Sequence, residues 1–332
     1  MPTHSKTAFL FTGQGAQWEH MGYALSISIP HIKSKLQFCI DYLQKKYSID
    51  LQSVIEKSAT SCDIHQTLYT QPALVMFEIA CANFLIEQGI KADYVIGHSV
   101  GEIAASHIAG FYTLENTLDL IANRSQLMQS LPKQGSMLAC ICDLNTVKVL
   151  LNSNPTYSQD IQIAGINSPK QTIVSGKSTS LDQFSQKLKD SGIKTIPLQV
   201  SHAFHSKLMQ PILESFHKKT KKLSILKQKE YPTLLLNQFG EEATALNLTS
   251  DYWCQQIIQP VNFIACIENA YKCGVRKFIE VGPQPILTKL SQKILSQEQD
   301  VVFAYCSDAK NPVKCLQQTL SLHNLSANIE HV

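Results

Sequence analysis

The sequence predicts an α/β protein with a parallel sheet, interrupted by a smaller inserted α+β unit of ferredoxin-like type. Two β-like runs, Thr7–Phe11 and 93–96, each lead into a glycine-bearing turn and then into helix-compatible sequence, which is typical of βαβ units. After Gly135 the pattern changes to short β-like runs that alternate with helical ones, which predicts the insertion. A chain of 332 residues is long enough to bury a full core in one large domain or two ordinary ones.

The large unit is predicted to be discontinuous, because longer helical and strand segments resume after His202. Its clearest element is the helix that starts at Gln71-Pro72, since proline suits the first helical position and Gly89 suits the position after the last turn. The elements expected in the large unit are the strand Thr7–Phe11, the turn Thr12–Trp18, the helix 71–89, the strand 93–96, a helix from Glu102, the strand 233–236, the helix 263–272 and the strand 277–281. The elements expected in the insertion are the strands 137–142, 161–166, 172–174 and 195–200 and the helices 144–151 and 181–189. We therefore expect the large unit at 1–134 and 202–290, the insertion at 135–201 and a separate C-terminal segment at 291–332.

Composition and charge exclude several classes of protein. Hydrophobic residues make up 44% of the chain and charged residues 17%, against a typical charged fraction of about 25%, which excludes disordered and collagen-like chains. A formal net charge of +3 argues against a dedicated nucleic-acid surface. The most apolar stretch, Ala73–Ile86, is interrupted by Glu78 and Asn83, so we expect no membrane span. The first six residues lack an apolar segment, so we expect no secretory signal.

The ten cysteines are scattered through apolar segments, and their closest pair, Cys140 and Cys142, does not form a C-x-x-C motif. This pattern is typical of reduced core residues in a cytoplasmic protein. We therefore expect neither a disulfide framework nor a metal site.

The pentapeptide Gly97-His98-Ser99-Val100-Gly101 fits the G-x-S-x-G nucleophile elbow. The two glycines leave room for a sharp strand-to-helix turn that projects the hydroxyl of Ser99 over the sheet edge. The backbone N–H of Val100 then lies at a helix N-terminus, where it can stabilise an oxyanion. The placement after a β-like run and before a helix favours a catalytic serine over a tight turn that merely contains one.

A serine nucleophile needs a base, and histidines are concentrated in two places. His98 adjoins the serine but points away from it in elbow geometry. His202 and His205 lie where the insertion rejoins the large unit, and such junctions are common sites of pockets. The residues alone do not decide between a catalytic and a structural role for this pair.

Four motifs occur in the order seen in acyl-CoA:acyl-carrier-protein transacylases: Phe11–Trp18, Gly97–Glu102, His202–His205 and Glu280–Pro283. The chain most resembles the malonyl-type acyltransferase domains of polyketide and fatty-acid synthases, from about residue 7 to about residue 290. The tail after Cys315 resembles the segment that follows such domains in modular synthases. The chain is therefore expected to be either a free-standing enzyme of this type or a domain of a longer polypeptide.

The resemblance implies an α/β-hydrolase-like large subdomain with a ferredoxin-like small one, in agreement with the pattern of elements. It implies that Ser99 is the nucleophile and His205 the base. The family lacks the acid of a catalytic triad, and the backbone carbonyl of Gln256 matches the group that orients the histidine instead. The oxyanion hole would combine the N–H groups of Val100 and Gln14.

The resemblance also implies a substrate with a free carboxylate. Arg124 follows the serine at the spacing seen in members that use dicarboxylic acyl groups, and its guanidinium fork suits a carboxylate. Val100 and the His202–His205 string resemble malonyl-selecting members, with Phe204 filling the space that an α-methyl group needs. His202, Phe204 and Asn167, the last in a loop that matches one near the family's pocket, are therefore expected to contact the substrate.

The expected reaction transfers a malonyl group from malonyl-CoA to the phosphopantetheine thiol of an acyl carrier protein. It requires no bound cofactor, metal, nucleic acid or membrane, and ketosynthase or other synthase domains are further expected partners. The basic run 217–222 is expected to be a solvated helix face rather than a carrier contact. Glu102 is expected to interact favourably with the helix dipole as an acidic residue of the first turn, without a catalytic role.

Two alternatives stay open from the sequence. A serine esterase or thioesterase, including one that edits carrier proteins, would share the elbow but use a late histidine such as His323. A catalytically silent docking domain would keep the fold without the chemistry.

Overall fold

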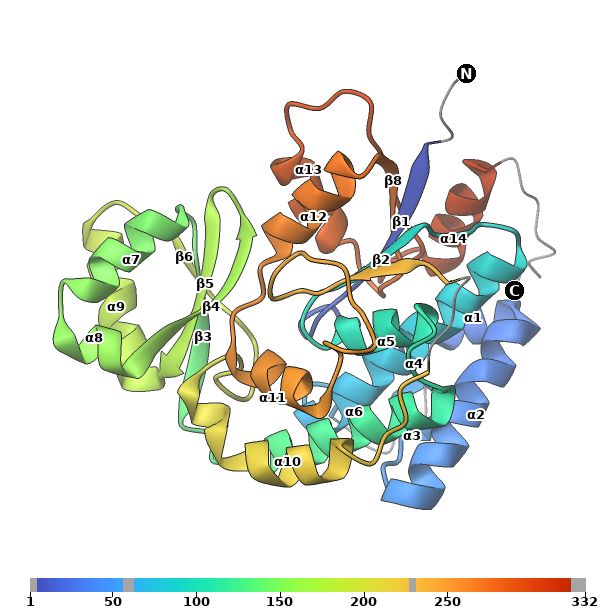
Figure 1. The fold of residues 1–332 in the computed structure, drawn as a ribbon, viewed down its shortest axis with the longest axis horizontal. Coiled ribbons are helices and arrows are strands. Elements are labelled where there is room, and N and C mark those ends of the chain that lie inside the picture. The colour runs from blue at the N-terminus through green and yellow to red at the C-terminus, as the bar shows by residue number, and fades with distance from the viewer. Residues whose placement is uncertain (1–4, 56–62, 227–230, 324–332) are drawn as a thin grey trace.

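The computed structural model describes residues 5–55, 63–226 and 231–323, which form two β-sheets and the helices that cover them (Figure 1). In chain order the elements are β1 (Lys6–Phe11), α1 (Tyr23–Ser28), α2 (Pro30–Tyr47), α3 (Gln52–Ile55), α4 (Thr67–Glu87), β2 (Tyr94–Gly97), α5 (Gly101–Ile108), α6 (Leu114–Gln129), β3 (Gly135–Cys140), α7 (Leu144–Asn152), α8 (Pro155–Asp160), β4 (Ile161–Ser168), β5 (Gln171–Lys177), α9 (Ser178–Asp190), β6 (Thr195–Pro197), the 3₁₀-helix η1 (Lys207–Ile212), α10 (Leu213–Thr220), β7 (Thr233–Leu235), α11 (Ser250–Ile258), α12 (Phe263–Lys272), β8 (Val275–Glu280), α13 (Leu287–Ile294), β9 (Val302–Tyr305) and α14 (Pro312–Ser321).

The larger sheet has five strands in the order β7-β2-β1-β8-β9, and every pairing in it is parallel. Its central strand β1 is buried on both faces, as a parallel sheet requires. Phe9 and Phe11 point into one core cluster, together with the apolar side chains of α4, whereas Ala8 and Leu10 point into a second one with α12 and α13. Because successive side chains of a strand point to opposite faces of the sheet, the apolar residues of β1 contribute to both clusters.

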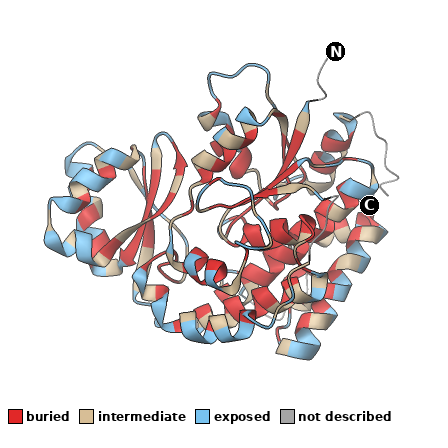
Figure 2. Ribbon diagram, viewed as in Figure 1, coloured by how far each residue is buried: buried red, intermediate tan, exposed pale blue. Residues whose placement is uncertain are grey.

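Helix α4 is long and apolar enough, by length and composition alone, to cross a membrane. In the structure 83% of its most apolar window is buried inside the protein, which is the state of a core helix (Figure 2). The helix begins at Thr67, four residues before the predicted start at Gln71, and Pro72 therefore lies inside it. The predicted end is close to the observed one, since Gly89 follows the last turn with φ +89°.

The smaller sheet is antiparallel, with the strand order β4-β5-β3-β6. Helices α7 and α8 connect β3 to β4, and α9 connects β5 to β6, which is the ferredoxin-like arrangement. The sheet and these helices share their own hydrophobic cluster, and the outer faces of the helices are exposed at one end of the molecule (Figures 1 and 2). The predicted fold class, a parallel α/β unit with a ferredoxin-like insertion, is confirmed.

Several observed elements were not expected from the sequence, among them α8 and β9. The short helix α8 has no buried residue, so it lacks the apolar face that would have indicated it. Strand β9 lies in the segment 291–332, which was predicted to be separate, yet it pairs with β8 through Lys277–Val302 to Glu280–Tyr305 and forms an edge of the large sheet. The described part of that segment is therefore integrated with the large sheet.

Candidate active site

Ser99 occupies a sharp turn between β2 and α5, where its backbone adopts the left-handed φ of +52°. Such a φ is uncommon for a residue with a side chain, and backbone strain of this kind clusters at active sites. The flanking glycines make the turn possible. A Cβ on Gly97 would collide with the backbone of Glu102, and one on Gly101 would collide with the carbonyl of Phe11.

The hydroxyl of Ser99 is hydrogen-bonded to a histidine from a distant part of the chain. Ser99 Oγ lies 2.7 Å from His205 Nε2, and His205 Nδ1 lies 2.8 Å from the backbone oxygen of Gln259. A carbonyl only accepts, so Nδ1 carries the proton and Nε2 is left to accept the serine hydroxyl. This is the arrangement that a general base requires.

The carbonyl that orients His205 is that of Gln259, whereas the sequence indicated Gln256. Gln259 follows the last residue of α11 in an extended conformation, so its carbonyl is free of the helix. The backbone N–H of His205 donates to Ile257 O at 3.1 Å, so two carbonyls at the end of α11 hold this residue. Pro260 has no N–H that could donate to the last carbonyls of α11, so these carbonyls remain available to His205.

Burial, together with the positive charge of Arg124, lowers the pKa of His205 from 6.5 to about 3. The buried imidazole is therefore neutral at neutral pH. A neutral imidazole with a bare Nε2 can take the serine proton.

One of the two expected oxyanion donors directly follows the serine in the elbow, and the other lies in the turn after β1. Val100 is buried at the N-cap of α5, one residue before the first helical N–H. Gln14 lies in the turn after β1, and it lines the same cavity as Ser99. The side chain of Gln14 accepts a long hydrogen bond of 3.5 Å from Gln71.

A cavity of about 380 Å³ opens over Ser99 between the large sheet and the small one. Phe204 and Asn167 line it as expected, and Asn167 Oδ1 is 2.9 Å from His98 Nε2. Further lining residues are His205 and, from α13 and the turn before it, Ile286, Leu287, Lys289 and Leu290.

His202 is not among the residues that line this cavity. Its ring nitrogens lie 2.8 Å from Ser201 Oγ and 2.9 Å from the backbone oxygen of Leu131. Both nitrogens are therefore engaged within the protein. The expected substrate contact of His202 is corrected to a structural role, in which its ring lies 6.0 Å from that of Phe204.

Arg124 lies on α6 and is only 2% exposed. Its Nη2 donates to Gln256 Oε1 at 3.3 Å, and the Gln256 amide nitrogen donates to the backbone oxygen of Ser99 at 2.7 Å. Burial lowers the pKa of Arg124 to about 9, which leaves the guanidinium charged at neutral pH, and the carboxylate of Glu102 acts in the opposite direction. Arg124 is thus a buried cation one side chain away from Ser99, and, like His202, it is not among the described residues that line the cavity.

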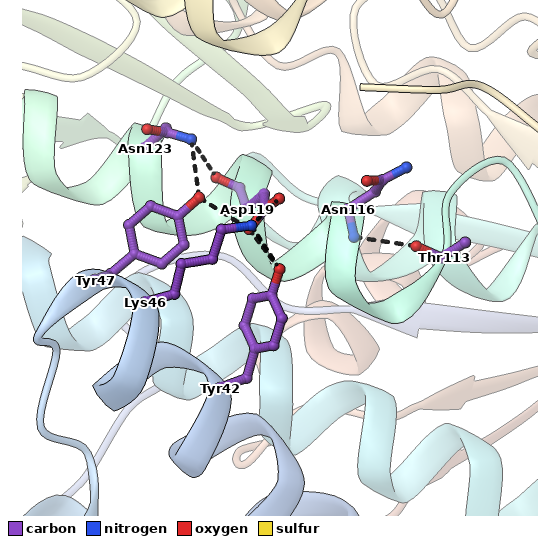
Figure 3. A network of polar contacts seen from close by, with 7 residues as sticks. All are labelled: Tyr42, Lys46, Tyr47, Thr113, Asn116, Asp119 and Asn123. Carbon is purple, nitrogen blue, oxygen red and sulfur yellow. Dashed lines mark hydrogen bonds and ion pairs between the residues drawn. The ribbon is translucent and has the colours of Figure 1, made fainter. Parts of the chain in front are cut away.

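The helix that carries Arg124 is tied to α2 by a polar network around Asp119 (Figure 3). The Asp119 carboxylate accepts from Lys46 Nζ at 2.7 Å and from the hydroxyls of Tyr42 and Tyr47 at 2.8 and 2.9 Å. The side-chain amide nitrogen of Asn123 donates to the backbone oxygen of Asp119 at 2.7 Å. These contacts fix α6 just before Arg124. No local sequence pattern indicated these contacts, because the partners are more than 70 residues apart.

The contacts of two buried glutamates at the site were not anticipated. Glu102, expected only to favour the helix dipole, accepts hydrogen bonds from the Tyr252 hydroxyl at 2.6 Å, the Asn237 N–H at 2.7 Å and the Gln256 amide at 3.1 Å. Burial raises its pKa to about 7.

Glu280, the first residue of the fourth motif, caps helix α13. Its carboxylate accepts from the N–H groups of Ile286, Leu287 and Thr288 at 2.9, 2.8 and 2.7 Å. Since α13 forms one wall of the cavity, the cap that Glu280 provides stabilises that wall.

A serine on a strand-to-helix elbow, hydrogen-bonded to an oriented histidine beneath a cavity, places the chain in the class of α/β proteins with a serine-nucleophile site. The sequence matches the acyl transferase domain family over residues 8–325, and the chain belongs to that family.

Similar proteins include large synthases. The chain is 33% identical over 303 residues to the spectinabilin polyketide synthase system protein NorB of Streptomyces orinoci, covering 89% of this chain and 14% of that protein. It is 33% identical over 280 residues to the mycoketide-CoA synthase of Mycobacterium tuberculosis, covering 84% of this chain and 6% of that protein. The chain thus spans only a small part of the length of these relatives.

Solved structures of similar fold include a domain of a synthase and a transacylase that this chain covers almost entirely. The acyltransferase domain from the second module of the salinomycin polyketide synthase is 30% identical with a TM-score of 0.87, over 96% of this chain and 73% of that one. The malonyl CoA-acyl carrier protein transacylase from Clostridium perfringens is 28% identical with a TM-score of 0.85, over 96% of this chain and 98% of that one.

Proposed function

We propose that this protein transfers a malonyl group from malonyl-CoA, through an ester on Ser99, to the phosphopantetheine thiol of an acyl carrier protein. The observation that carries the proposal is the 2.7 Å hydrogen bond from Ser99 Oγ to an oriented, neutral His205, beside the buried Arg124. Family membership supports acyl transfer, and the named activity of the Clostridium perfringens structure supports the malonyl group and the carrier.

In the first half-reaction Ser99 Oγ attacks the thioester carbonyl while its proton moves to His205 Nε2. The resulting oxyanion is stabilised by the N–H groups of Val100 and Gln14, each contributing about 3–4 kcal/mol on the scale measured for such donors. The C–S bond then breaks, and CoA leaves with the proton from His205. A malonyl ester of Ser99 remains.

In the second half-reaction the carrier's phosphopantetheine thiol gives its proton to His205 Nε2 and attacks the ester. The C–O bond breaks, and Ser99 regains its proton from His205. The same histidine therefore serves both halves of a ping-pong reaction, and the chemistry uses no resident cofactor or metal.

Substrate selection is assigned to Arg124, Phe204 and Asn167. Arg124 would bind the free carboxylate of the malonyl group, because a buried carboxylate without a partner is costly. Phe204, buried on the cavity wall, would limit space at the α-carbon, and a single methyl group is worth only about 1–3 kcal/mol of discrimination. Asn167 would contact the acyl group from the small sheet.

The proposed partners are an acyl carrier protein and, as in modular synthases, a ketosynthase and other synthase domains. The synthases named above support this context. We place the protein in the cytoplasm, since the nine cysteines in the described residues are all free thiols, eight of them buried.

The proposal is tested against the hydrolase alternative by measuring where the malonyl group goes. Incubation with malonyl-CoA and a phosphopantetheinylated carrier should load the carrier, whereas a thioesterase would release free malonate. The late histidine that the alternative needs is not favoured, because Ser99 Oγ is hydrogen-bonded to His205 Nε2 and His323 is not among the described residues that line the cavity. Release of malonate without carrier loading would refute the transferase.

A further inference from the structure

The side chain of Gln256 connects the nucleophile elbow to the arginine. It is 1% exposed and lies in the last two turns of α11. Its amide nitrogen donates to the backbone oxygen of Ser99 at 2.7 Å and to Glu102 Oε2 at 3.1 Å, and its amide oxygen accepts from Arg124 Nη2 at 3.3 Å. One buried amide therefore meets three groups of the site.

The chemistry of these neighbours fixes which way the amide faces. The carbonyl of Ser99 and an ionised Glu102 can only accept, so both require the NH₂ end of Gln256. A guanidinium can only donate, so Arg124 requires the oxygen end. All three contacts are satisfied in one orientation of the amide. Rotating the amide by 180° would place its oxygen against the two acceptors and its NH₂ group against the guanidinium.

Glu102 is itself held rigidly, because the Tyr252 hydroxyl and the Asn237 N–H both donate to its Oε1. It is fully buried, and its negative charge is the one that favours the charged form of Arg124. Glu102 thus acts on Arg124 in two ways, through the charge directly and through the orientation of Gln256.

Arg124 keeps donors available in this arrangement. Its Nε has no hydrogen-bond partner among the described residues, although the atom is buried. A guanidinium has five N–H donors in a planar fork, so anchoring Nη2 on Gln256 fixes the plane while leaving donors for a carboxylate. An unsatisfied buried donor is costly unless a ligand completes it.

We propose that Gln256 is a positioning residue that fixes Arg124 for acyl groups bearing a second carboxylate, and that Glu102 sets the orientation of the Gln256 amide. This inference rests on the proposed function, in which Arg124 binds the malonyl carboxylate. It adds a determinant of selectivity that acts through Arg124 without touching the substrate.

The test compares Ser99 acylation by malonyl-CoA and by acetyl-CoA, which lacks the second carboxylate. Gln256→Ala should lower kcat/KM for malonyl-CoA roughly 10- to 100-fold, mainly through KM, because a hydrogen bond to a charged group is lost. The loss with acetyl-CoA should be several-fold smaller, so the malonyl-to-acetyl ratio falls. The matched control is Gln255→Ala, the exposed neighbour on the same helix, which should leave the ratio unchanged.

Glu102→Gln keeps the size of the side chain but no longer forces the orientation of Gln256. It should lower the same ratio by a smaller factor than Gln256→Ala, which keeps the inference testable if the alanine variant folds poorly. An equal loss with both acyl groups in both variants would mean a merely structural role and would overturn the inference alone. A parent protein that forms no acyl-enzyme with malonyl-CoA would instead overturn the proposed function and the inference with it.

Discussion

Lowering the pH should leave the acylation of Ser99 nearly unchanged down to about pH 5. The proposed base, His205, has its pKa lowered from 6.5 to about 3 by burial and by the charge of Arg124, with a smaller contribution from His98 in the same direction. A base acts in its neutral form, so activity is lost only as the pH falls through the pKa of the folded protein. At pH 5 a histidine of pKa about 3 is about 99% neutral, whereas one of ordinary pKa is only about 3% neutral.

The assay is the single-turnover rate of malonyl-enzyme formation between pH 5 and pH 8, followed by intact mass. The structure predicts a change of less than about two-fold from His205, against the roughly 30-fold loss expected for an ordinary histidine. Glu102 is the neighbouring buried acid with a pKa of about 7, so Glu102→Gln is measured in parallel to separate its titration. Circular dichroism at each pH checks that the protein stays folded.

A loss of rate with a midpoint near pH 6.5 in both proteins would refute the reasoning, because it would show a solvated or differently oriented base. A second check uses the sign of the arginine's effect. Since Arg124 lowers the pKa of His205, Arg124→Ala should move any acidic limb of the profile to higher pH. A shift in the other direction would contradict the electrostatic account.

Three further outcomes follow from the same contacts. Arg124→Ala should lower malonyl-CoA acylation by roughly 10²- to 10⁴-fold, on the scale of about 3–5 kcal/mol for breaking a buried charge pair, with a smaller loss for acetyl-CoA, and equal losses would remove its carboxylate role. Phe204→Ala should raise the ratio of methylmalonyl to malonyl acylation roughly 10-fold, and an unchanged ratio would show that this wall does not select. Glu280→Ala should lower the free energy of unfolding, measured in urea, by about 1–2 kcal/mol, because it removes the cap of α13. The control Glu268→Ala, on the exposed face of α12, should leave it unchanged, and equal urea midpoints for the two variants would contradict the capping role.

The elbow could be found from sequence because its chemistry is local. Gly97 and Gly101 are required by contacts with the backbone of Glu102 and Phe11, and the neighbouring strand and helix have clear patterns of their own. The parallel sheet and the inserted unit were predicted for the same reason, since each strand and helix carries its period in a short window.

The support of the site could not be found in this way. Gln259 holds His205 because of how α11 ends, and the choice between it and Gln256 depends on carbonyl directions that no spacing reveals. His202 and His205 are both histidines of one short motif. Only the folded structure directs the His202 ring toward the backbone oxygen of Leu131. The interactions of Glu102 likewise involve residues more than 130 positions away.

The most direct test of the account is intact-mass analysis after mixing the protein with malonyl-CoA, followed by peptide mapping. The account predicts one added malonyl group, located on the peptide that contains Ser99, absent from Ser99→Ala and released when a phosphopantetheinylated carrier is added. An unchanged mass in the parent protein, or a malonyl group that persists in Ser99→Ala, would contradict it.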